Sequence, residues 1–321
     1  MKKKPDWKRV LSSVLFVGLI ALLCVYLYLN REDMLELLRL DAQTVALMTC
    51  LALGCCVMNA VYHRVILSTY RIPLRLTDWM GVVFVSNAMA YVLPMRADLV
   101  FSAAYYKRTK GLAYVKSVSM AAGNIVFGVL FALLQMLAAL LCTGFIDGVW
   151  SVTLWAVWTV CAAGMAAFIV FSLLFQNREP RLMRRYRLVR DVVAGFNALL
   201  RNRGLLWRLL ACLTANNLMQ LFLYMVCFRA IGLDVTVYQA LFYNSVSWLA
   251  SIVAVVPGNI GIKEAVMGVA TSLMGTLFQN GVAVSLLQRA AVMAVYMAAG
   301  LAFAYPVWRN WNRAERAGRQ A

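Results

Sequence analysis

The amino-acid sequence predicts an all-α integral membrane protein, a polytopic helical bundle with two re-entrant broken hairpins in an inverted-repeat arrangement. Three observations predict it: the composition, the long uncharged runs and two breaks inside such runs. Of 321 residues, 63% are hydrophobic and 14% are charged, whereas a soluble domain carries about 25% charged residues. A hydrocarbon core about 30 Å thick needs roughly 20 apolar residues in a helix. The uncharged runs are 10–30, 42–62, 79–95, 117–146, 148–177, 209–228, 235–262, 265–288 and 290–308.

The placement of charge predicts the orientation. Connections with an excess of lysine and arginine face the cytoplasm by the positive-inside rule. They are 1–9, 63–78, 107–116, 176–208 and 309–321, whereas 30–42, 144–149 and 231–238 lack such an excess and are expected outside. The formal net charge of +18 is therefore interpreted as topology and attraction to anionic lipid headgroups, and not as nucleic-acid binding.

Five crossings and one hairpin follow for the first part of the chain. Helices near 10–29 and 43–62 go out and return, and helices at 117–143, 150–175 and 209–231 cross next. Residues 79–106 start and end beside cytoplasmic loops, so they are predicted to enter and leave on the same side, with a break near "YVLPMRAD". One crossing with a basic external loop is the alternative.

The last three apolar segments allow two arrangements. Residues 239–256, 262–278 and 282–306 could be three full crossings, or one hairpin from outside followed by one crossing. The break at "VVPGNIGIKEA" favours the hairpin, because charge and non-helical backbone are tolerated at depth only where they face protein or water. Two hairpins of opposite orientation are typical of inverted-repeat transporters.

The chain is expected to form a single transmembrane domain over 1–321, with a first half at about 10–143 and a second at about 150–308. Between the crossings, 176–208 is arginine-rich and places Val189, Val193 and Phe196 on one helical face. We interpret this segment as a basic amphipathic helix on the anionic headgroups of the inner leaflet, with a dock for a cytosolic partner as the alternative.

The candidate site is drawn from the charged residues at the two breaks. No catalytic motif, metal cluster or nucleotide loop is present, so we expect no cofactor and no metal. Lys263 could bind an anionic headgroup at the start of the helix after the break, or pair with Glu264 as scaffold. Arg289 could pair with Glu264 or hold a phosphate. The candidate substrate-binding residues are Arg96, Asp98, Pro257, Gly258, Asn259, Gly261, Lys263, Glu264 and Arg289.

Two stretches carry a family resemblance. "PGNIGIKEA" resembles the P-G-G-x-G-x-x-E-A signature of the lysylphosphatidylglycerol synthase transmembrane, or flippase-like, family, with Asn259 in place of a glycine. "LPMRADLVFSAAYYKR" resembles its first-half motif, P-G-R-x-G-E, but only Pro94 and Arg96 match, and Asp98 offers a carboxylate one position early. The resemblance covers about 10–305 and implies re-entrant hairpins and lipid translocation. In two-part members a soluble aminoacyl-transferase domain follows the membrane part. This chain stops soon after its last helix, so we expect no transferase activity.

These observations lead to one expected function and two alternatives. We expect a flippase-like transporter that moves a phospholipid, such as an aminoacyl-phosphatidylglycerol, or a polyprenyl-linked lipid between leaflets. The alternatives are a non-catalytic membrane partner of a separately encoded lipid-modifying enzyme, and a membrane-embedded headgroup enzyme that uses Asp98 or Glu264 as base. The expected location is the inner (plasma) membrane, multi-pass, with both termini cytoplasmic.

Overall fold

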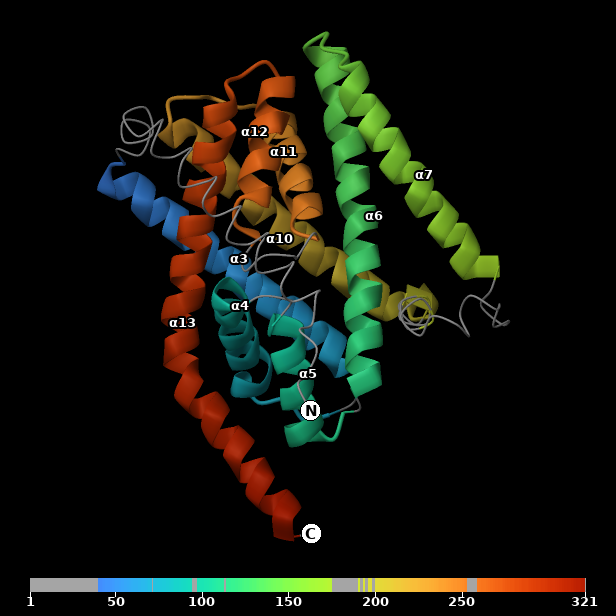
Figure 1. Ribbon diagram of the computed structural model, residues 1–321, viewed down its shortest axis with the longest axis vertical. Helices are drawn as coiled ribbons and strands as arrows, with labels where there is room; N and C mark the ends of the chain where they lie inside the picture. The colour runs from blue at the N-terminus through green and yellow to red at the C-terminus, as the bar shows by residue number, and fades with distance from the viewer. Residues whose placement is uncertain are drawn as a thin grey trace, which may run out of the picture.

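The described part of the chain is entirely helical, as predicted (Figure 1). The structure is a computed structural model. It describes residues 40–70, 72–93, 97–112, 114–174, 200–252 and 259–320, together with 190, 193, 196 and 197. The first predicted helix, at 10–29, lies outside the described residues. Within them no strand is present. An all-α class follows from the need of a backbone in lipid to satisfy its hydrogen bonds within each helix.

Among the residues that the structure describes, five helices are long and apolar enough to span a membrane. They lie where crossings were predicted, and most of them extend beyond a predicted end, whereas the helix Val152–Leu174 falls within its predicted range. They are α3 (Ala42–Ser68), α6 (Tyr114–Ile146), α7 (Val152–Leu174), α10 (Arg203–Ala230) and α13 (Phe278–Gln320). The last apolar run and the basic tail thus form one continuous helix, and α3 continues into what was expected to be a cytoplasmic loop.

The remaining helices are short and come in two pairs. The π-helical turn η1 (Thr77–Gly81) leads into α4 (Val82–Val92), which packs against α5 (Ala97–Lys110). The second pair is α11 (Val237–Ala250) and α12 (Ile262–Leu273). A helix of 14 residues is about 21 Å long, which is less than a hydrocarbon core. The two pairs lie in opposite halves of the long axis, α4 and α5 low and α11 and α12 high in Figure 1.

Helix α13 contacts both short pairs. On the α4 side, Phe84 packs against Tyr296 and Phe303, with ring centroids 5.7 and 6.0 Å apart. On the α12 side, a Cβ at Gly281 would lie 2.3 Å from the Met267 carbonyl oxygen, so the two backbones approach closely because residue 281 is glycine. Such close approach of small residues is how helices associate in lipid.

The segment 176–208 is only partly described. Its last six residues belong to the spanning helix α10, which begins at Arg203 and is capped by the Asn202 side chain, so the predicted boundary at 208 is too late. Val193 and Phe196 are buried within the protein, and the Phe196 ring contacts Phe168 of α7 at 5.8 Å. Binding of this segment to headgroups stays a prediction.

Candidate functional site

The break between α11 and α12 has a backbone that few residues adopt. Asn259 has a φ of 54° and Gly261 a φ of 87°. Asparagine is one of the few non-glycine residues found at positive φ, which explains why Asn259 can stand at a position where the family signature has glycine. The Asn259 side-chain amide donates to the Ser251 carbonyl at 3.0 Å, so it ties the start of α12 to the end of α11.

The two carboxylate oxygens of Glu264 have different partners at this break. One carboxylate oxygen, Oε2, accepts a hydrogen bond of 2.8 Å from the Gly261 backbone N–H and so caps α12. The other, Oε1, forms an ion pair of 2.8 Å with Arg289 Nη2 of α13. The two side chains are 1% and 9% exposed. Arg289 also donates to the Asn259 carbonyl at 3.2 Å. Arg289 therefore links α13 to the break.

The expected alternative of a Lys263–Glu264 ion pair is wrong. Adjacent residues on a helix point about 100° apart, so their side chains do not face each other. Lys263 Nζ donates instead to Gln288 Oε1 at 2.6 Å, and Gln288 Nε2 donates to Gln220 Oε1 of α10 at 3.2 Å. Lys263 is thus held by neutral amides. Gln288 did not stand out in the sequence because it carries no charge.

The four residues Asn259, Lys263, Glu264 and Arg289, which we call the charged cluster, carry an excess of positive charge. Two cations face one carboxylate, so their formal sum is +1. Asn259 Oδ1 is buried with no hydrogen-bond partner among the described residues. Buried charge is stabilised by an opposite charge, so the cluster suits an anion.

Of the other predicted site residues, the structure describes only Asp98. Arg96, Pro257 and Gly258 fall outside the described residues. Asp98 is partly exposed in the first turn of α5, where a carboxylate interacts favourably with the helix dipole. That the two breaks together form one site remains a prediction.

A second buried carboxylate, Asp78, escaped the sequence analysis because it was interpreted as a loop charge. It pairs with Lys110 at 2.6 Å and accepts from the Tyr105 hydroxyl and the Arg75 backbone N–H, each at 2.9 Å. The Tyr106 hydroxyl donates to its carbonyl at 2.8 Å. These contacts, which we call the Asp78 hub, join η1 to α5. No sequence spacing marks such a hub, since the side chains that contact the carboxylate, Tyr105 and Lys110, lie about 30 residues away.

Some polar residues elsewhere in the apolar helices join one helix to another, and others bond to a carbonyl of their own helix. Asn244 of α11 donates to Asn217 of α10 at 2.7 Å, and the Tyr224 hydroxyl donates to Ser247 at 2.6 Å. Asn87 donates to the Val83 carbonyl of its own helix. These contacts fit the usual role of polar residues between membrane helices.

Comparison with known proteins gives one finding. No curated protein and no solved structure matches the chain. The family described as lysylphosphatidylglycerol synthase TM region matches residues 9–300, a range that holds the two breaks, the charged cluster and the described spans up to α13. This match covers most of the chain and agrees with the resemblance of its motifs, and so the chain belongs to the lysylphosphatidylglycerol synthase transmembrane family, whose function concerns membrane lipids.

Proposed function

We propose that this protein is a flippase-like transporter that passes the anionic headgroup of a phospholipid between leaflets along the charged cluster. The observation that carries the proposal is the excess cation of that cluster, Lys263, half-buried at a helix break in a membrane protein. A buried ionisable residue in a spanning bundle marks a substrate path more often than a scaffold. Discontinuous helices with such residues are where transporters bind their substrates.

The two short pairs support this proposal. Each helix is too short to cross alone, and the pairs lie in opposite halves of the molecule (Figure 1). Two hairpins that enter from opposite sides have this appearance. If the first apolar run, 10–30, also crosses, six crossings return the chain to its starting side and both termini are cytoplasmic, in the inner membrane as the basic loops predict.

In this mechanism Lys263 and Arg289 receive the headgroup phosphate. Glu264 keeps Arg289 in place and occupies the Gly261 N–H, while the next N–H groups of the α12 N-terminus have no acceptor within the helix. Helix N-termini attract phosphate for this reason. Both Glu264 oxygens already have partners, which supports transport over proton transfer by this carboxylate.

The experiment is lipid movement in vesicles that contain the purified full chain. Fluorescent phosphatidylglycerol is placed in both leaflets, and dithionite then quenches the label that is outside. Wild type should allow quenching beyond the outer-leaflet half. Lys263→Gln should slow this movement about tenfold, whereas Arg229→Gln, which alters an exposed cation at the end of α10, should not.

Two results would contradict the proposal. One is quenching that stops at the outer-leaflet half in wild-type vesicles. The other is equal movement in wild type and Lys263→Gln. The partner alternative predicts the first result together with copurification of a lipid-modifying enzyme, and the enzyme alternative predicts a chemically altered lipid.

A further inference from the structure

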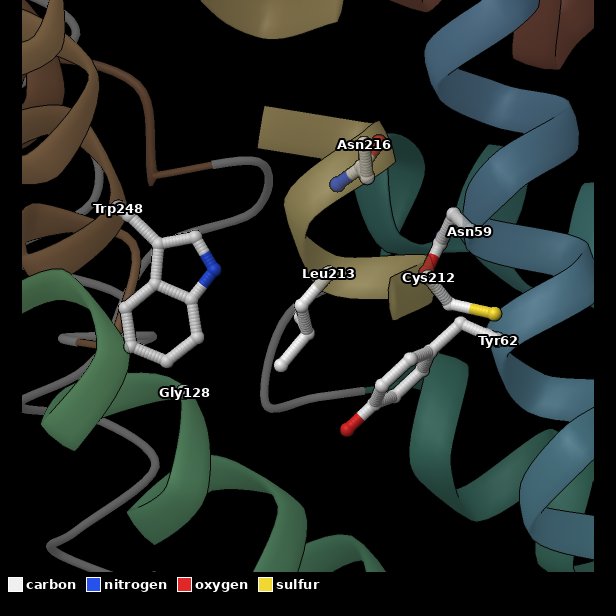
Figure 2. A pocket seen from close by; sticks show the side chains of 7 residues that line it. All are labelled: Asn59, Tyr62, Gly128, Cys212, Leu213, Asn216 and Trp248. Carbon is white, nitrogen blue, oxygen red and sulfur yellow. The ribbon is translucent and has the colours of Figure 1, made fainter. Parts of the chain in front are cut away.

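A cavity of about 90 Å³ lies between four helices, apart from the charged cluster (Figure 2). Helices α3 and α10 supply its polar side, and α6 and α11 supply a wall of glycine and tryptophan. Its lining residues are Asn59, Tyr62, Gly128, Cys212, Leu213, Asn216 and Trp248. None of them carries a charge, so the cavity suits a neutral group and not a phosphate or an amine.

Two polar groups of this lining have unmet hydrogen-bonding capacity. The Tyr62 hydroxyl and Asn216 Oδ1 are buried and have no hydrogen-bond partner among the described residues. Tyr62 as a whole is 5% exposed and extends from α3 toward α6 and α11 (Figure 2). Asn59 is anchored by a hydrogen bond of 2.9 Å to the Tyr296 hydroxyl. Buried polar groups are normally hydrogen-bonded, so this cavity is built for a guest that can donate and accept.

The opposite wall is flat and apolar. A Cβ at Gly128 would lie 2.2 Å from the Trp248 ring, so glycine allows the ring to lie directly against α6. An aromatic face opposite hydroxyl and amide groups suits a small polyol, whose carbon side is apolar and whose edges form hydrogen bonds.

The cavity and the charged cluster are joined along α10. Asn216 lies one turn before Gln220 on the same face of the helix. Gln220 accepts from Gln288, which in turn accepts from Lys263. One helical turn of α10 thus separates the cavity lining at Asn216 from Gln220, the amide that connects through Gln288 to Lys263.

We infer that this cavity receives the uncharged, hydroxyl-bearing part of the lipid headgroup, while the charged cluster receives its phosphate. The inference rests on the proposed function for the origin of the ligand. It assigns Tyr62 as a residue that determines specificity for the hydroxyl groups of the headgroup.

The test compares two lipids that differ only in hydroxyl groups. Dihexanoyl phosphatidylglycerol and dihexanoyl phosphatidylpropanol share the phosphate and the three-carbon headgroup, and their binding to the full chain in detergent is measured by native mass spectrometry. Wild type should prefer phosphatidylglycerol by about 2-fold to 10-fold, as expected for one or two neutral hydrogen bonds. Tyr62→Phe should lower phosphatidylglycerol binding to the level of phosphatidylpropanol and leave the latter unchanged.

Matched variants separate this effect from general damage. Tyr305→Phe removes a hydroxyl from a side chain that is 64% exposed and should change neither lipid. Cys212→Leu, which fills part of the cavity and leaves the Tyr62 hydroxyl in the chain, should also abolish the preference. Competition by glycerol 1-phosphate, which has no acyl chains, would support the cavity and assign it to a soluble polyol phosphate.

Equal binding of both lipids by wild type and Tyr62→Phe would overturn the inference and mean that the cavity holds water only. Lipid movement in vesicles is scored separately. A Tyr62-dependent lipid preference without lipid movement would support the cavity as a headgroup site and contradict the proposed transport. Lipid movement without that preference would support transport and contradict the role of the cavity.

Discussion

The two short helix pairs both hold a buried carboxylate, but the carboxylates differ in how fully they are satisfied. At the first pair, Asp78 forms an ion pair with Lys110 and accepts hydrogen bonds from the Tyr105 hydroxyl and the Arg75 backbone N–H. One anion there faces one cation. In the second, Glu264 meets Arg289 while Lys263 remains beside them with only an amide partner. A buried ion pair alone thus does not indicate a binding site, whereas an unbalanced charge at a helix break does.

The largest expected effect is the loss of Arg289. Arg289→Ala leaves Glu264 buried without its cation, which typically costs about 3–5 kcal/mol of stability. Chemical denaturation of the purified protein in detergent measures it. The double variant Glu264→Leu with Arg289→Leu should lose less than Arg289→Ala, because two apolar residues can replace a buried pair. A loss no larger than that of Arg229→Ala would show that the pair is not buried.

Removal of the Asp78 carboxylate should come next. Asp78→Asn leaves Lys110 and Tyr105 without a charged acceptor, and the expected loss is about 2–3 kcal/mol because Lys110 is partly exposed. The rate of lipid movement per folded molecule should stay at the wild-type level. Slower lipid movement at an equal amount of folded protein would place the Asp78 hub in the transport path. The two pairs would then not differ in function.

Gly261→Ala tests the geometry of the second break. A Cβ is strained at a φ of 87°, and the expected cost is about 2 kcal/mol in the same denaturation assay. Gly164→Ala is the matched control, since nothing lies within 4 Å of a Cβ there and the residue is inside α7. That control should be neutral or stabilising. Equal effects at the two glycines would show that the break is not rigid.

Lys263→Gln should separate function from stability. The ammonium has one neutral partner, so its loss should hardly lower the unfolding midpoint, while lipid movement falls about tenfold, the equivalent of about 1.4 kcal/mol. A large loss of stability with normal movement would instead make Lys263 a scaffold residue like Lys110.

The smallest effect concerns Tyr238, at the start of α11 in the second pair. The Tyr238 hydroxyl donates to Asp147 of the α6–α7 loop, and this hydrogen bond raises the pKa of Tyr238. A raised pKa in the folded state means that the contribution to stability is present below the ordinary pKa near 10. It is lost as pH rises through the folded value. Wild type should therefore lose slightly more thermal stability than Tyr238→Phe between about pH 9 and 11, and identical slopes would contradict this.

The fold was largely predictable because lipid imposes simple rules on composition. Run lengths predicted the spanning helices, and "VVPGNIGIKEA" predicted the break before α12. The pairing of Arg289 with Glu264 was one of two alternatives raised, and only the structure selects it.

The rest depended on contacts between residues distant in sequence. Lys263 meets Gln288 across 25 residues, and the Asp78 hub joins side chains from two helices. Tyr62 and Trp248 lie within long uncharged runs, where no charge or motif singles them out. Whether a hydroxyl is buried without a partner is decided by tertiary packing, which leaves no periodic signal in the sequence.

Helix α13 has a mechanical consequence. It carries Arg289, which holds the second break, and Phe303, which stacks on Phe84 of the first pair. These two residues are 14 positions apart, or about 21 Å along one rod. A rigid tilt of α13 that moves Arg289 away from Glu264 would also shift Phe303 relative to Phe84. The two short helix pairs are thus mechanically coupled through α13.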